Sequence, residues 1–166
     1  MAPGESSSAP RGLPRGPLGL FGFVLYYTCD ILAPLMMPIV STLPDPAALA
    51  EALRCVRFTA ANERRLQDGI EQHLAAWSPG LFQREYRLSP SDRPDFFAPA
   101  SGLVVEIKWA PSGGSVAKVA AQLSRYAEHA AVRAILVCSP SRRVISQIPT
   151  SIGRVPVHGV VLTTGF

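Results

Sequence analysis

The sequence of 166 residues is poor in cysteine and histidine, and each shortage excludes a class of site. The three cysteines are widely spaced and form no C-x-x-C pair, so the sequence supports neither a disulfide framework nor zinc ligation. The three histidines are scattered and show neither the spacing of a two-histidine metal site nor a Ser-His-Asp arrangement. We therefore expect neither a zinc enzyme nor a triad hydrolase, and the expected location is a reducing cytoplasm.

Lysine is also scarce, since the sixteen basic residues are fourteen arginines and two lysines. A net charge of +4 is ordinary for a soluble protein. It is also compatible with a nucleic-acid partner, because arginine binds phosphate through two hydrogen bonds at once. Hydrophobic residues make up 48% of the chain, which argues against a disordered protein and, at this length, for one compact domain.

The N-terminal part of the chain differs in composition from the rest. Residues 1–17 are rich in proline, glycine and serine and are expected to be disordered, whereas residues 18–40 are nearly all apolar. Three interpretations stay open for the apolar stretch: a membrane anchor, a signal peptide, or translated sequence upstream of a start at Met36 or Met37. A central aspartate and two prolines oppose a membrane span. We expect residues 1–44 to be an extension that need not belong to the native domain.

The most informative segment is an apolar run that carries two opposite charges. Residues 103–109 (Leu-Val-Val-Glu-Ile-Lys-Trp) are largely β-branched or apolar and are flanked by turn residues, a pattern that predicts a β-strand. Side chains alternate between the two faces of a strand, so Glu106 and Lys108 share one face with Val104. Charges in so apolar a strand are costly to bury unless they are paired or have a task.

Asp95 is expected to lie beside Glu106. Residues 94–97 (Pro-Asp-Phe-Phe) predict a second short strand, and residues 99–102 (Pro-Ala-Ser-Gly) have the composition of a turn. The two strands would form a hairpin that brings the carboxylates together. Both offer the hard oxygen ligands that suit Mg²⁺, with Mn²⁺ as a substitute. The alternative is an edge strand with a solvated Glu106 and Lys108, and Asp95 as a turn residue.

Four short motifs follow one another along the chain in an order that indicates a known family. Glu63 lies on a predicted helix, Pro94-Asp95 follows, then Glu106-Ile107-Lys108, and the next predicted helix carries Gln122-Leu123-Ser124-Arg125-Tyr126. This order resembles the signature of the PD-(D/E)xK nuclease superfamily, which includes restriction endonucleases and Holliday-junction resolvases. Members often carry a glutamate upstream of the PD strand and Q-x-x-x-Y after the E-x-K strand. The resemblance covers about residues 47–140.

This resemblance implies a restriction-endonuclease-like α/β sandwich over residues 45–166, with a mixed central sheet flanked by helices (an αβββαβ core). It also implies a metal-dependent nuclease that hydrolyses the phosphodiester bonds of DNA. Asp95 and Glu106 would bind Mg²⁺, and Lys108 would orient or deprotonate the attacking water or stabilise charge in the transition state. Glu63 would bind a second metal or hold a metal-bound water.

Supporting roles fall to three further residues. Gln122 and Tyr126 are four apart on a helix and therefore share a face, from which they would support the ligands or position the DNA backbone. Arg84 interrupts the apolar face of a predicted strand and is either an edge residue or a phosphate contact. Asp68, Glu71 and His73 fall off the apolar stripe of their helix and are expected to be solvated.

The alternatives to a nuclease are a non-cleaving nucleic-acid-binding or structural module on the same fold, and a small membrane-anchored protein. Because the chain leaves no room for a separate recognition domain, a homodimer or a partner protein is a further expectation. The expected secondary structure is helices at 47–55, 61–77 and 115–130, strands at 82–88, 134–138 and 155–163, a Ser-Gly-Gly-Ser turn at 112–115, and a polar loop at 140–150.

Overall fold

The structure is a computed structural model that describes residues 43–109 and 116–165. The extension expected at residues 1–44 lies outside these ranges apart from its last two residues, and the expected Ser-Gly-Gly-Ser turn lies outside them entirely. Among the helices of the described ranges, none combines the length and the apolar character that a membrane span requires.

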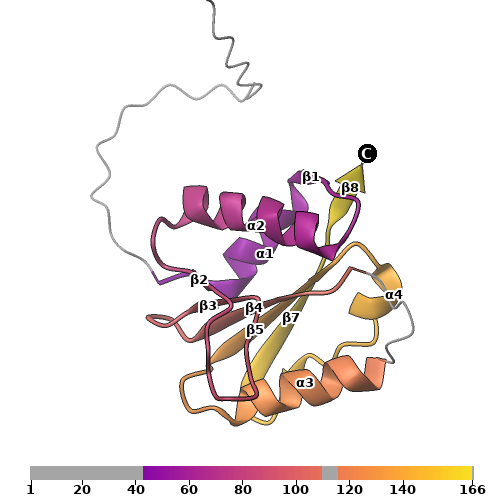
Figure 1. Cartoon of the computed structure of the whole chain (residues 1–166). Coiled ribbons are helices and arrows are strands. Elements are labelled where there is room, and N and C mark those ends of the chain that lie inside the picture. The colour runs from indigo at the N-terminus through magenta and orange to yellow at the C-terminus, as the bar shows by residue number, and fades with distance from the viewer. Residues whose placement is uncertain (1–42, 110–115, 166) are drawn as a thin grey trace, which may run out of the picture. The chain divides into compact units, whose positions relative to one another are not determined.

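The described ranges contain four helices and eight strands (Figure 1). The helices are α1 (Pro46–Arg54), α2 (Glu63–Trp77), α3 (Val116–Glu128) and α4 (Arg142–Ile145). The strands are β1 (Arg57–Thr59), β2 (Gln83–Arg84), β3 (Phe96–Ala98), β4 (Leu103–Ile107), β5 (Ala134–Ser139), β6 (Ser151–Ile152), β7 (Val155–Val161) and β8 (Thr163–Gly165).

Six strands form the central sheet, in the order β2-β3-β4-β5-β7-β6. The strands β4, β5 and β7 run parallel, while β2, β3 and β6 join antiparallel to their neighbours. The sheet is therefore mixed, as expected from the sequence. The strands β1 and β8 pair separately as a two-stranded parallel sheet.

Helices cover both faces of the central sheet. In Figure 1, α1 and α2 lie on one side of it and α3 on the other. Each face has its own buried cluster: α1 and α2 pack on the apolar residues of β4 with odd numbers, from Leu103 to Ile107, and α3 packs on Val104. The faces predicted for the strand at residues 103–109 are confirmed, and the mixed α/β architecture is the one expected.

Local signals explain the two N-terminal helices. Asp45 caps α1, because its Oδ2 accepts a hydrogen bond from the backbone N–H of Ala48 (2.8 Å), and proline occupies the first helical position. Asn62 caps α2 in the same way, so that this helix begins two residues later than predicted. Its stripe of Leu66, Ile70 and Leu74 is buried as expected.

The hairpin of β3 and β4 is confirmed. The two strands pair antiparallel, with Phe96 opposite Val105. Gly102 closes the turn with a φ of 71°, and a Cβ at this position would collide with the carbonyl oxygen of Ala131. Because β4 lies between β3 and β5 and all five of its residues are buried, the alternative of a solvated edge strand is wrong.

Other local predictions were wrong. The strand expected at residues 82–88 is reduced to β2, because Glu85 has a φ of 48° and the chain leaves the sheet there. The polar loop expected at 140–150 contains α4, capped by Ser141, whose Oγ accepts from the N–H of Val144 at 3.4 Å. The strands β1 and β8 were not predicted, since each is only three residues long and its partner lies about a hundred residues away.

Candidate active site

Asp95 lies at the start of the hairpin and is bonded to the strand beside it. Its Oδ2 accepts a hydrogen bond from the backbone N–H of Ile107, with 2.6 Å between nitrogen and oxygen. Its Oδ1 accepts from Nε2 of Gln67 on α2 at 2.8 Å. The hairpin thus brings Asp95 to the end of β4, where the sequence predicted it.

Glu106 is the most deeply buried charged group of this region, with 2% of its side chain exposed. One oxygen, Oε1, accepts hydrogen bonds from Nζ of Lys108 (2.7 Å) and from Nε2 of Gln122 on α3 (2.8 Å). The other, Oε2, is buried and has no hydrogen-bond partner among the described residues. A buried carboxylate oxygen without a donor is unfavourable unless a further group, such as a cation, approaches it.

Lys108 keeps its positive charge in this setting. Burial alone would lower the pKa of Lys108, but the charge of Glu106 and the hydrogen bond to it outweigh burial, and the pKa is raised above its usual value. The side chain is 23% exposed, so the ammonium lies between the buried carboxylate and solvent. In this state Lys108 is a hydrogen-bond donor and a positive charge, not a base.

The two carboxylates repel each other. Burial, followed by the charge of Glu106, raises the pKa of Asp95 to about 7, against the opposing N–H of Ile107. Burial also raises the pKa of Glu106, although Lys108 opposes the shift. With Glu63, the region holds three carboxylates against one ammonium, a formal charge of −2 when all are ionised. The region therefore carries an excess of negative charge.

Glu63 begins α2 and reaches the end of β4. Its Oε2 accepts a hydrogen bond from the backbone N–H of Trp109 at 3.0 Å, directly after Lys108. It does not join the two other carboxylates as a third ligand, because no three His, Cys, Asp or Glu side chains of residues 43–109 and 116–165 lie close enough for a metal site. The structure therefore places Glu63 next to Asp95 and Glu106, but not close enough to bind the same metal ion.

The carboxylate site is defined as Asp95, Glu106 and Lys108, and its two carboxylates are the residues that could hold a Mg²⁺ ion. Mg²⁺ is usually held in proteins by one or two carboxylates, with water and substrate phosphate as the other ligands. Glu106 offers its unpartnered Oε2. Both oxygens of Asp95 keep a second acceptor site after their one hydrogen bond each. The residues present thus fit a two-carboxylate site.

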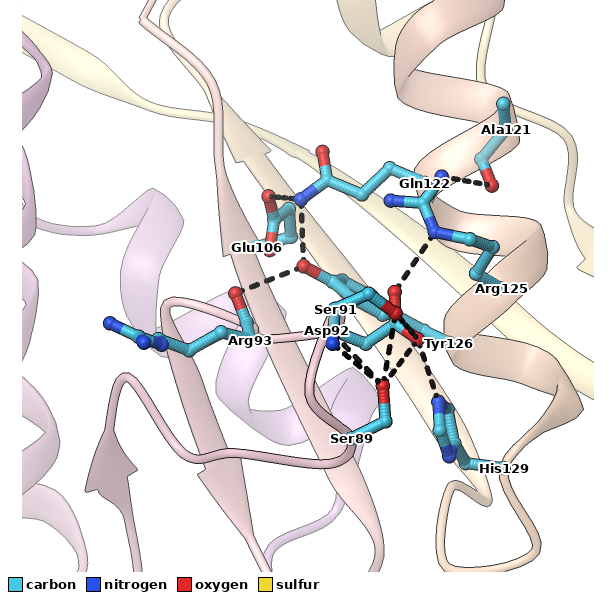
Figure 2. Close-up of polar contacts among 10 residues, drawn as sticks. All are labelled: Ser89, Ser91, Asp92, Arg93, Glu106, Ala121, Gln122, Arg125, Tyr126 and His129. Carbon is cyan, nitrogen blue, oxygen red and sulfur yellow. Dashed lines mark hydrogen bonds and ion pairs between the residues drawn. The ribbon is translucent and has the colours of Figure 1, made fainter.

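Gln122 on α3 reaches Glu106 of the carboxylate site, and Tyr126 lies beside Gln122 (Figure 2). Besides Glu106, Nε2 of Gln122 donates to the hydroxyl oxygen of Tyr126 at 2.7 Å. The Tyr126 hydroxyl in turn donates to the backbone carbonyl of Arg93 at 3.1 Å, two residues before Asp95. The pair therefore connects Glu106 with the segment that carries Asp95.

Arg84 contacts protein groups. Its Nη1 pairs with the carboxylates of Asp68 (2.9 Å) and Glu71, and its Nη2 donates to Oε1 of Gln67 at 3.3 Å. Asp68 and Glu71 keep 40% and 47% of their side chains exposed, so both are solvated as expected, and both are also ion-paired with Arg84. His73 was expected to be solvated as well, but its Nε2 is buried without a partner among the described residues. With 27% of its side chain exposed, Arg84 holds β2 against α2 beside the carboxylate site.

Sequence reasoning missed Asp92, whose carboxylate ties the segment before Asp95 to α3 (Figure 2). Asp92 accepts hydrogen bonds from Nε of Arg125 (2.9 Å) and Oγ of Ser89 (2.9 Å), and it contacts Nε2 of His129 at 3.1 Å. The hydrogen bond from Arg125, followed by that from His129, holds the pKa of Asp92 well below its usual range. No local pattern signals these contacts, since Arg125 on α3 and His129 directly after it lie more than thirty residues away.

Gln67 was missed as well, although a signal was present. It lies four residues after Glu63 and therefore on the same face of α2, the face that meets the end of β4. An amide at this spacing from a candidate site residue is a candidate partner of the same site.

Comparison of the chain with family models, with curated proteins and with solved structures finds no match. The indication of function is therefore the arrangement itself. A buried carboxylate, a half-buried one and an ammonium lie at the end of β4, and polar side chains from α2 and α3 hold them there.

Proposed function

We propose that this chain is a magnesium-dependent nuclease that hydrolyses the phosphodiester bonds of DNA. The observation that carries the proposal is the buried Oε2 of Glu106, which has no partner within residues 43–109 and 116–165 and lies near a second carboxylate of raised pKa, that of Asp95. A structural ion pair would be neutral and fully bonded. An excess of negative charge next to one free acceptor is instead what a divalent cation requires.

The roles of the residues follow from their contacts. Asp95 and Glu106 would hold the cation. Mg²⁺, when bound, supplies positive charge at the phosphate oxygens and promotes the ionisation of water. Hydrolysis joins a water oxygen to phosphorus and breaks the bond to the leaving oxygen, so that negative charge gathers on the phosphoryl group. Lys108 carries the positive charge that stabilises this group, because its raised pKa keeps it protonated.

The remaining polar groups keep the carboxylates in place. Gln122 donates to Oε1 of Glu106, which leaves Oε2 as the free oxygen. Tyr126 holds the backbone before Asp95. Glu63 accepts from the N–H of Trp109 and fixes the end of β4 against α2. Fixed ligands matter because small displacements of a site lower the rate strongly.

The proposal extends to the fold and the location. The order α2, β2, β3, β4, α3, β5, with the carboxylate site at the hairpin, supports a restriction-endonuclease-like sandwich. The free thiols of Cys55 and Cys138 support a reducing cytoplasm as the location.

The test is a panel of linear, supercoiled, single-stranded and branched DNA, incubated with the full chain and Mg²⁺ or Mn²⁺. We expect cleavage of at least one substrate, lost in chelator and in the Asp95→Ala and Lys108→Ala variants. Lys118→Ala is the matched control, because Lys118 is the only other lysine and is exposed on α3. A wild-type protein that cleaves none of these substrates would overturn the proposal and favour a non-cleaving nucleic-acid-binding module.

A further inference from the structure

Gln67 contacts a proposed metal ligand but has no role in the function proposed above. It projects from α2, and its Nε2 donates to Oδ1 of Asp95 at 2.8 Å. The other oxygen of Asp95 already accepts from the backbone N–H of Ile107 at 2.6 Å. One donor on each oxygen fixes the rotation of the carboxylate about its last bond, a rotation that is otherwise broad.

Arg84 determines which way the amide of Gln67 points. An amide has a donor end and an acceptor end, and Nη2 of Arg84 donates to Oε1 of Gln67 at 3.3 Å. An arginine cannot accept a hydrogen bond, so this contact is favourable only when the oxygen faces Arg84. The NH₂ group is then directed at Asp95.

Arg84 is itself anchored to the same helix. Nη1 pairs with Asp68 at 2.9 Å and with Glu71, both on α2. The side chain also lies over the ring of Phe96, the residue after Asp95, with 5.9 Å between the guanidinium carbon and the ring centre. The guanidinium is therefore positioned by two carboxylates and an aromatic ring.

We propose that Gln67, oriented by Arg84, is a positioning residue that sets the orientation of the Asp95 carboxylate for a divalent cation. This inference rests on the proposed function, since it assigns Asp95 as a ligand. We call this chain of contacts the relay: Asp68 and Glu71 hold Arg84, Arg84 orients Gln67, and Gln67 orients Asp95. The competing explanation is that the relay only attaches β2 to α2.

Two variants of the full chain test the relay. Gln67→Ala removes the hydrogen bond to Asp95. Arg84→Lys retains a positive charge for Asp68 and Glu71 but lacks the second N–H group that reaches Gln67. The matched controls are Gln72→Ala, an exposed residue of α2, and Arg87→Lys, an exposed arginine near β2.

The readouts are the Mg²⁺ concentration for half-maximal cleavage, the rate at saturating Mg²⁺, and the rise in thermal midpoint that Mg²⁺ causes without DNA. For Gln67→Ala we expect the half-maximal Mg²⁺ concentration to increase about 10- to 100-fold, the usual cost of losing a partner of a metal ligand. The thermal shift at a fixed low Mg²⁺ concentration is lost, while saturating Mg²⁺ restores most of the rate. Arg84→Lys changes the same quantities in the same direction, and the two controls match the wild type.

The results separate the two proposals. A Gln67→Ala variant that is less stable but needs the same Mg²⁺ concentration as the wild type overturns the positioning role and leaves the nuclease proposal intact. A wild type that neither cleaves DNA nor gains stability from Mg²⁺ overturns both. If Gln67→Ala does not fold, Arg84→Lys decides: an unchanged Mg²⁺ requirement overturns the relay, and an increased one supports it.

Discussion

Replacement of Glu106 by glutamine tests the electrostatics of the carboxylate site without changing its shape. The new amide keeps an oxygen where Oε1 accepts from Lys108 and Gln122. Its nitrogen takes the place of Oε2, which has no partner among the described residues, so no observed hydrogen bond is lost. The substitution therefore removes the buried charge and the ionic part of its pairing with Lys108, while the hydrogen bonds to Oε1 remain.

The size of the effect follows from the pKa shifts. The pKa of Asp95 is raised from its usual 3.8 to about 7. At about 1.4 kcal/mol for each unit, the environment disfavours its charge by a few kcal/mol, and the charge of Glu106 is the largest cause after burial. Since the pKa of Glu106 is itself raised despite Lys108, its ionised form is also unfavourable in the fold. We expect Glu106→Gln to increase the unfolding free energy of the metal-free protein by ~1–2 kcal/mol at pH 8.

The pH dependence has a definite sign. A carboxyl with a raised pKa binds protons more tightly in the folded than in the unfolded state. The metal-free wild type therefore loses stability as the pH rises from about 4 to about 7, the window between the two pKa values of Asp95. The advantage of Glu106→Gln is small at the lower end of this window and complete above it.

Chemical denaturation in chelator, at several pH values, measures this advantage. The same experiment with Mg²⁺ should stabilise the wild type and not the variant, and the variant should not cleave DNA. Glu128→Gln, at an exposed position of α3, is the control for a change of net charge. The reasoning is refuted if Glu106→Gln destabilises the metal-free protein, or if Mg²⁺ stabilises variant and wild type equally.

Three further predictions concern binding and the segment before Asp95. Lys108→Ala should abolish cleavage but retain most DNA binding in a gel-shift assay, because the lysine acts on the transition state; equal loss of binding would contradict this. The logarithm of the affinity for duplex DNA should fall by about 0.9 per tenfold rise in salt for each phosphate neutralised, and an affinity indifferent to salt would exclude backbone contact. Asp92→Asn should lower the thermal midpoint above pH ~4. The pKa of Asp92 is lowered in the fold, so its carboxylate stabilises the protein at pH values above the pKa of the unfolded chain, and the difference in midpoint between variant and wild type should disappear in acid. If the difference in thermal midpoint between variant and wild type stays constant down to low pH, the charge of Asp92 does not stabilise the fold.

The carboxylate site could be predicted because its residues are close in sequence. Glu106 lies on β4 and Asp95 directly precedes β3, the other strand of the same hairpin, and the turn between the two strands is predicted by its composition. The alternation along residues 103–109 placed Glu106 and Lys108 on one face, and the structure bears this out. The spacing of four between Gln122 and Tyr126 placed both on one face of α3, and the structure shows that this face reaches Glu106.

The errors arose where a local pattern was weak or was overridden. Residues 82–88 alternate as a strand does, yet the chain turns at Glu85, where the backbone N–H bonds to the carbonyl oxygen of Asp95 at 2.8 Å. Arg84 interrupts the apolar face because it pairs with two carboxylates of α2, and the alternation of residues 82–88 gives no sign of those partners. Charge pairs between elements leave no periodic trace in a sequence.

The sequence by itself determined the helices α1, α2 and α3, the strands β4 and β5, and the meeting of Asp95 with Glu106. Each of these depends on apolar periodicity, capping residues or a short turn, which act over a few residues. The tertiary structure alone decided the environment of the site: the unpartnered oxygen of Glu106, the amide of Gln67 on Asp95, and the bond from Arg125 to Asp92. These features depend on which elements pack together, and burial and charge contacts exist only once the layers have assembled.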